Sequence, residues 1–127
     1  MNERGRVQRL QHASIPRPAG SAEQARRFYG ELLGLEELPL PASLAQLDLV
    51  WYRLGEDELH LFAAERGAHP AQHFCLQLDA LDGLRERLLA ARVALGAEPD
   101  IPNRPRFTFH DPFGNLIEAT TILGPYT

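Results

Sequence analysis

The sequence has 127 residues, of which 44% are hydrophobic and 24% are charged. That length fits one domain, and the composition is typical of a globular chain rather than a disordered, collagen-like or coiled-coil one. The net charge of -4 argues against nucleic acid or an anionic membrane as a partner. All 13 basic residues are arginine. Without lysine, Schiff-base chemistry and the lysine of a phosphate-binding loop are excluded.

The cysteine content and the N-terminus favour a cytoplasmic protein. Cys75 is the single cysteine, so no disulfide can form within the chain. Residues 1–9 are polar and rich in arginine, and no apolar run approaches the roughly 18 residues of a membrane span. We expect Cys75 to be a small buried residue rather than a nucleophile, because no neighbouring arginine or helix start would lower its pKa.

The first elements in chain order are a strand and a helix. Residues 7–15 alternate between apolar and polar, which predicts a strand, and the Pro- and Gly-rich segment 16–20 predicts a loop. We expect the helix to begin at Ser21, which forms a capping-box pattern with Gln24, and to end at Gly34. Its apolar stripe consists of Ala25, Phe28, Tyr29, Leu32 and Leu33.

A hairpin is predicted next. Two short apolar segments, 47–54 and 58–63, are joined by the turn-forming residues 55–57. This spacing favours two antiparallel strands.

The second half starts the pattern again after a loop at 65–71. A strand at 72–78 is followed by a helix whose leucine stripe ends at Gly96. The remaining segments predict a proline-rich loop, a strand, a turn and a closing strand, at 99–105, 106–110, 111–115 and 116–122.

The two halves have the same spacing. His12 lies 22 residues before Gly34, and His73 lies 23 residues before Gly96. We therefore predict a single α+β domain over 1–127 with two paired βαβββ modules, at about 7–64 and 72–123. Neither module can bury its sheet alone, so together they would form a curved mixed sheet around a cleft.

Four polar residues in the predicted strands are candidate metal ligands. His60 and Glu118 are lone polar residues in apolar strands, and such groups need a partner when buried. His60 follows His12 by 48 residues and Glu118 follows His73 by 45, so the modules would place these four side chains around a pseudo-twofold centre. A strand histidine is more often simply hydrogen-bonded, so periodicity alone does not assign a metal.

Other residues are candidates for a substrate pocket. Ser14 shares the face of His12. Trp51 and Phe62 would line a pocket or belong to the core. Arg53, or Arg106 on the same strand face as Thr108, would hold an anionic group unless it forms a surface ion pair.

Three segments together resemble a known family. They are Leu10-Gln11-His12, the helix segment 25–35 with its sequence ARRFYGELLGL, and 111–118 with its sequence DPFGNLIE. Over about residues 9–122 the chain resembles the vicinal oxygen chelate superfamily of glyoxalases, bleomycin-resistance proteins and extradiol dioxygenases.

The resemblance implies a metal site. His12, His73 and Glu118 match the family's common ligands, and His60 falls where glyoxalase-like members often have Glu or Gln as a fourth ligand. The implied cofactor is a divalent ion, Zn, Ni, Mn, Co or Fe(II). Glu118 and His60 are then the candidate catalytic residues, and whether His60 ligates the ion or transfers protons stays open.

The resemblance also implies a function. It favours a glyoxalase-like isomerase or lyase that acts on a small substrate chelated through vicinal oxygens. The alternatives are an extradiol-type dioxygenase and a metal-free protein that binds a drug and confers resistance. A homodimer is expected, since short chains of this family pair and open sheets leave edges to protect.

Overall fold

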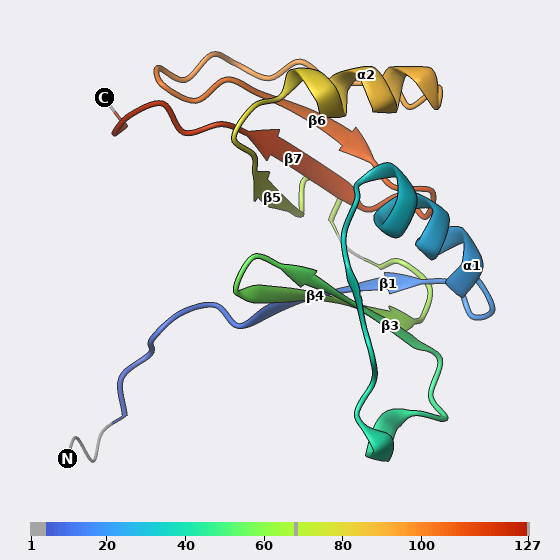
Figure 1. The fold of residues 1–127 in the computed structure, drawn as a ribbon. Coiled ribbons are helices and arrows are strands. Elements are labelled where there is room, and N and C mark those ends of the chain that lie inside the picture. The colour runs from blue at the N-terminus through green and yellow to red at the C-terminus, as the bar shows by residue number, and fades with distance from the viewer. Residues whose placement is uncertain (1–4, 68, 127) are drawn as a thin grey trace.

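The computed structural model describes residues 5–67 and 69–126 and consists of two β-sheets with helices packed against them (Figure 1). Within the described residues, no helix is long and apolar enough to cross a bilayer. The elements are β1 (His12–Arg17), α1 (Ala22–Ala25), the π-helix η1 (Arg26–Leu32), β2 (Glu37–Leu38), the 3-10 helix η2 (Ala42–Leu44), β3 (Leu49–Leu54), β4 (Asp57–Ala63), β5 (His73–Gln77), α2 (Asp82–Ala90), β6 (Arg106–His110) and β7 (Leu116–Thr120).

The first sheet has the strand order β1-β4-β3-β2. β1 runs parallel to β4, and β3 and β4 form the predicted antiparallel hairpin. The two-residue strand β2 has too short a pattern to be predicted. β1 begins at His12 rather than at residue 7, and it continues through Pro16 to Arg17 where a loop was expected. A strand tolerates proline there because β1 is at the edge of the sheet.

The second sheet has the order β5-β7-β6, with β5 parallel and β6 antiparallel to β7. A single bridge between Gly96 and Thr108 takes the place of a further strand. The predicted α+β class with mixed sheets is confirmed. The described strands form two sheets rather than one continuous sheet, because β1 and β5 are each hydrogen-bonded on one side only.

The first helix differs from its prediction in two ways. The Ser21 hydroxyl donates to the Pro18 carbonyl instead of capping the helix, so the predicted capping box is wrong. From Arg26 the helix widens into a π-helix, and the amide of Leu33 donates to the carbonyl of Phe28, five residues earlier. The stop at Gly34 is where it was expected, with a φ of 77° that suits glycine.

The second helix ends at Ala90, before the predicted stop at Gly96. Arg92 has a φ of 63°, and the amide of Val93 donates to the carbonyl of Leu88. This left-handed residue turns the chain back although it is not glycine. Gly96 instead pairs with Thr108, which explains why a glycine occurs there.

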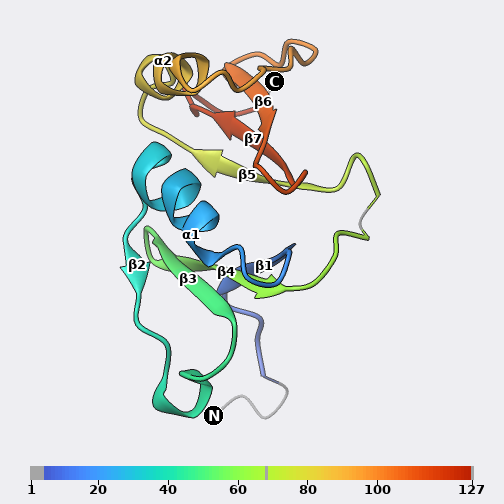
Figure 2. The same cartoon turned by 90° about the vertical axis from the view of Figure 1, so that its right-hand side faces the viewer.

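The hydrophobic core joins the two halves of the chain. The helical segment α1–η1 covers the first sheet and lies between the two sheets, while α2 covers the second sheet (Figure 2). The Phe28 ring lies 6.2 Å from that of Phe109, and the Tyr29 hydroxyl donates to Asp111 at 2.6 Å. These contacts connect the helical segment of the first half to the second half of the chain.

Arg17, the last residue of β1, is fully buried. The Arg17 guanidinium pairs with the Asp48 carboxylate at 2.5 Å, and the same carboxylate accepts from the amide of Gly20. These hydrogen bonds lower the pKa of Asp48. The proline and glycine residues of 16–20 predicted a loop there, so this ion pair was not predicted.

Candidate functional site

Three aromatic rings stack across the helix-free face of the first sheet. The His60 ring on β4 lies 3.9 Å from the Trp51 ring on β3, with an interplanar angle of 3°. On its other side, it lies 4.1 Å from the His12 ring on β1. Neighbouring strands are about 4.8 Å apart, so side chains on adjacent strands can stack in this way. The stack holds both candidate histidines of the first module in fixed positions.

Hydrogen bonds define which nitrogen each of these histidines presents. Nδ1 of His12 lies 2.6 Å from Oε1 of Gln11, and this oxygen can only accept, so Nδ1 carries the proton and Nε2 keeps its lone pair. Nε2 of His60 lies 2.8 Å from Oε1 of Glu58, which leaves Nδ1 as its other nitrogen. The hydrogen bond from His60 is the main reason that the pKa of Glu58 is lowered.

The second sheet carries the other two candidate ligands. Nδ1 of His73 lies 2.9 Å from the carbonyl oxygen of Ala71, which can only accept, so Nδ1 is the protonated nitrogen. Nε2 of His73 lies 3.2 Å from Oε1 of Glu118. With the proton on Nδ1, the lone pair of Nε2 of His73 would face a lone pair of Oε1 of Glu118. The contact is favourable only with a second proton on His73 or with a cation shared by the two atoms.

Neighbours of Glu118 complete its surroundings. Nη1 of Arg106 lies 3.4 Å from Oε2 of Glu118, and Nη2 donates to the carbonyl of Pro99. The Arg106 guanidinium therefore already has partners within the chain. Cys75 lies opposite Glu118 on β5 and is exposed, so the expectation of a buried residue is wrong. Partial burial and the charge of Glu118 raise the pKa of its thiol to about 11, which keeps it protonated at neutral pH.

The four candidate ligands form two pairs rather than one cluster. Among residues 5–67 and 69–126, no three His, Cys, Asp or Glu side chains come close enough together to hold a metal ion. His12 and His73 do line one cleft, about 1000 Å³ in volume, between β5 and the β3–β4 turn. His60 and Glu118 are not in its lining. The spacing predicted that all four side chains surround one pseudo-twofold centre. In the structure, one pair lies on each sheet.

The remaining pocket candidates are also distributed over both sheets. Ser14, Trp51 and Phe62 lie on the face of the first sheet that carries the histidine stack. Arg53 is exposed and pairs with Glu36, which agrees with the alternative that it forms a surface ion pair. Thr108 lies opposite Glu118 but is buried, and its hydroxyl donates to Glu98.

Sequence reasoning missed the residues that hold the histidines in place. Glu58 precedes His60 by two residues, so strand alternation places both on one face, and this signal was available. Gln11 precedes His12 directly and gave no such signal. The carbonyl of Ala71 is a backbone group, which a sequence pattern cannot reveal.

Comparison with known proteins identifies the family. A family model described as Glyoxalase/Bleomycin resistance protein/Dioxygenase superfamily matches residues 9–119, and the chain belongs to this superfamily. The expected resemblance is therefore confirmed. No curated protein matched the sequence.

Solved structures share the fold over almost the whole chain. A putative glyoxalase family protein from Bacillus anthracis is 28% identical with a TM-score of 0.85, and the match covers 93% of this chain and 98% of that one. The antibiotic binding protein TnmS3 from Streptomyces sp. CB03234 is 23% identical, with a TM-score of 0.69 and coverages of 91% and 97%. A lactoylglutathione lyase from Agrobacterium tumefaciens is 20% identical, with a TM-score of 0.68 and coverages of 91% and 94%.

Proposed function

We propose that this chain is a metal-dependent isomerase or lyase that acts on a small substrate chelated through vicinal oxygens. The divalent ion would be held by His12, His73 and Glu118. The contact between Nε2 of His73 and Oε1 of Glu118 carries this proposal, because its geometry leaves room for a shared cation.

The donor set fits a metal ion in its chemistry. Histidines that bind metals usually donate their other N–H to a carbonyl or carboxylate, and His12 and His73 both donate through Nδ1. Two ligands about 2.1 Å from one ion lie about 3.0 Å apart in octahedral and about 3.4 Å apart in tetrahedral coordination, and the 3.2 Å between His73 and Glu118 lies between these values. Imidazole and carboxylate donors suit Zn, Ni, Mn, Co or Fe(II).

A second copy of the chain would complete the site. The pair His12 and His60 lies on one sheet, the pair His73 and Glu118 lies on the other, and the edges of β1 and β5 are both free of ladder partners in the described chain. In the proposed twofold dimer, the first pair of each copy would face the second pair of the other. We therefore propose a homodimer with two equivalent sites.

The chain's own residues would bind the substrate and move its proton. The chemistry supplied by a bound divalent ion is polarisation of the chelated oxygens and stabilisation of the negative charge that develops on them. Arg106 holds Oε2 of Glu118 and so orients this carboxylate. His60 is clamped between Trp51 and His12 and bonded to Glu58, which supports a role in proton transfer rather than as a fourth ligand.

Metal analysis of protein purified without a histidine tag tests the ligand assignment. Glu118→Ala should lose stoichiometric metal and hemithioacetal isomerisation, whereas Glu86→Ala, at an exposed site on α2, should keep both. His60→Ala should keep the metal and lose turnover. Wild-type occupancy in Glu118→Ala contradicts the assignment.

Mixing two inactive variants tests whether the site is shared between copies. A heterodimer of His12→Ala and Glu118→Ala chains contains one intact site if ligands come from both copies, and none if each chain builds its own site. We expect the mixture to recover up to a quarter of wild-type activity, since about half of randomly formed dimers are mixed and each has one of two sites. No recovery, with mixed dimers demonstrated, refutes the shared site.

A second candidate function is metal-free sequestration of a planar apolar ligand. The ring stack of Trp51, His60 and His12, with the exposed Phe62 beside it, favours this alternative. Trp51 is the single tryptophan, so its fluorescence reports directly on this face. If a planar aromatic probe quenches it equally in Glu118→Ala and wild type and neither contains metal, the sequestering function replaces the enzymatic one.

A further inference from the structure

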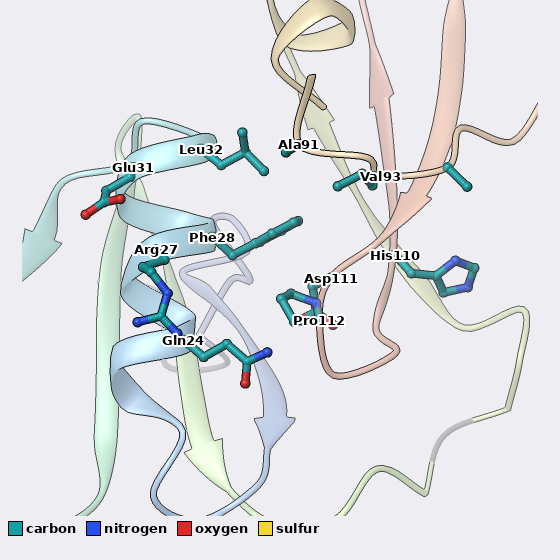
Figure 3. A pocket seen from close by; sticks show the side chains of 11 residues that line it. Gln24, Arg27, Phe28, Glu31, Leu32, Ala91, Val93, His110, Asp111 and Pro112 are labelled. Atoms are coloured by element: carbon teal, nitrogen blue, oxygen red, sulfur yellow. The ribbon is translucent and has the colours of Figure 1, made fainter. Parts of the chain in front are cut away.

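A second cavity lies away from both ligand pairs. It has a volume of about 650 Å³ and lies between the helical segment α1–η1 and two turns of the second half, the turn after α2 and the β6–β7 turn (Figure 3). None of its lining residues belongs to the cleft that contains His12 and His73. Pockets of this size accommodate small organic ligands. We call this cavity the helix groove.

The π-helix shapes one wall of the helix groove. Gln24, Phe28 and Leu32 recur every four residues, which places them on one side of the helical segment α1–η1. The groove floor is apolar, because the Phe28 and Leu32 side chains point toward Val93 and Ala91 across the gap (Figure 3). Stretches of π-helix occur frequently at functional sites.

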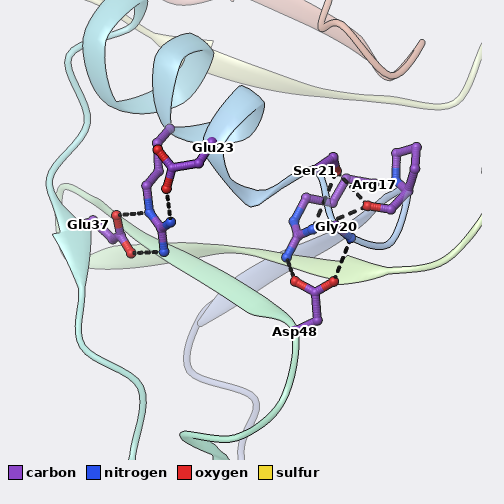
Figure 4. A network of polar contacts seen from close by, with 8 residues as sticks. Arg17, Gly20, Ser21, Glu23, Glu37 and Asp48 are labelled. Atoms are coloured by element: carbon purple, nitrogen blue, oxygen red, sulfur yellow. Dashed lines mark hydrogen bonds and ion pairs between the residues drawn. The ribbon is translucent and has the colours of Figure 1, made fainter.

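One arginine of the helix lies beside this groove and has no ion-pair partner among the described residues. The Arg26 guanidinium is bound by Glu23 and Glu37 (Figure 4). The next residue, Arg27, lines the groove and makes no hydrogen bond or ion pair with any other described side chain. Its side chain lies next to the Gln24 amide at the rim (Figure 3).

The other ionisable residues around the groove do not neutralise Arg27. The Glu31 carboxylate and the His110 ring point away from the groove (Figure 3). Asp111 is buried, and its two oxygens already accept four hydrogen bonds, from Tyr29, Phe113 and twice from Asn115. The helix groove therefore combines an apolar floor with a positive group at its rim.

We propose that the helix groove binds an amphipathic carboxylate. The hydrocarbon body would lie on Phe28, Leu32 and Val93, and the carboxylate would accept hydrogen bonds from Arg27 and Gln24. The groove is formed by both halves of the chain, so such a ligand would bridge them. This site does not depend on the metal-dependent function proposed above, because the two share no residue.

Titration of ¹⁵N-labelled protein with octanoate tests the proposal, with octan-1-ol as the uncharged counterpart. Octanoate should shift the amide signals of residues 24–32 and 91–94 and leave those of His12 and His73 unchanged. Arg27→Gln should weaken octanoate binding about fivefold, the upper range for a solvent-exposed charge pair. It should leave octan-1-ol binding unchanged. Arg6→Gln, outside the groove, is the matched control.

A steric variant tests the location independently. Ala94 lines the groove and is exposed, so Ala94→Trp should fill the groove and abolish octanoate binding, whereas Ala97→Trp, also exposed but outside it, should not. Wild-type octanoate affinity in either Arg27→Gln or a folded Ala94→Trp protein overturns the proposal. So does a set of octanoate shifts confined to His12, His73 and their neighbours. If Ala94→Trp fails to fold, Arg27→Gln decides alone, because Arg27 is exposed and pairs with no described side chain.

Discussion

Removal of one buried hydroxyl should loosen the contact between the two halves of the chain. The Tyr29 hydroxyl donates to Oδ2 of Asp111 at 2.6 Å, and Asn115 donates to the same oxygen at 2.8 Å. Asn115 also donates to the carbonyl of Pro16. Burial and the charge of Asp111 raise the pKa of Tyr29, so its hydroxyl keeps the proton that it donates. Through this network the β6–β7 turn is bonded to both η1 and β1.

Tyr29→Phe removes this donor and leaves the ring in place. Hydrogen bonds to charged groups contribute about 1.5–3 kcal/mol, and a buried acceptor that loses its partner cannot regain it from water. We therefore expect the free energy of unfolding to fall by about 2 kcal/mol. With a urea m-value of about 2 kcal/mol/M, the unfolding midpoint should fall by about 1 M at unchanged m.

Tyr52→Phe provides a matched control. Tyr52 is also fully buried, but its hydroxyl has no hydrogen-bond partner among the described residues, and burial raises its pKa to about 12. Its removal should change stability by less than about 0.5 kcal/mol, or stabilise the fold, because an unpaired buried hydroxyl is unfavourable. Equal midpoint shifts in the two variants would refute this reasoning, as would a Tyr29→Phe loss below about 0.5 kcal/mol.

Three further changes follow from the packing. Asp48→Asn leaves the buried Arg17 without its anion; after allowance for the exposure of Asp48, the loss should be about 1–2 kcal/mol at pH 7. Because the pKa of Asp48 is lowered by folding, the difference from wild type should shrink in denaturation curves as the pH falls below about 4. Arg92→Gly should raise the free energy of unfolding by up to about 1 kcal/mol, and with it the thermal midpoint, because glycine adopts a positive φ without strain. A lower midpoint would contradict the idea that the positive φ of Arg92 costs stability. Gly96→Ala places a Cβ against the Thr108 hydroxyl and should destabilise the fold by about 1–3 kcal/mol; additive losses in the double variant with Thr108→Ala would contradict this clash.

Local pattern was enough to locate most elements. The hairpin of β3 and β4 and the strand β6 lie where alternation and turn residues predicted them, because each depends on neighbours within a few residues. The end of α2 was misplaced since Arg92 adopts a left-handed conformation that its residue type does not signal. The change to π-helix at Arg26 was likewise invisible, because α- and π-helical turns share the same amphipathic residues.

Strand alternation and mirrored spacing singled out the candidate ligands, and both are properties of the chain itself. His12 and His60 do lie together, as do His73 and Glu118. The tertiary structure decided how the two pairs are arranged. They lie on separate sheets whose edges β1 and β5 carry no ladder to each other in the described chain, and no local pattern encodes the relative position of two sheets.

The sequence by itself determined the α+β class and the superfamily, and it singled out the residues that we propose as metal ligands. Only the tertiary structure decided which nitrogen each histidine presents, because that depends on acceptors such as Glu58 and the Ala71 carbonyl. It alone revealed the helix groove, which forms where Phe28 faces Val93 across 65 residues of sequence. The physical reason is that periodicity fixes the face on which a side chain lies, whereas cavities and hydrogen-bond partners arise from contacts between distant segments.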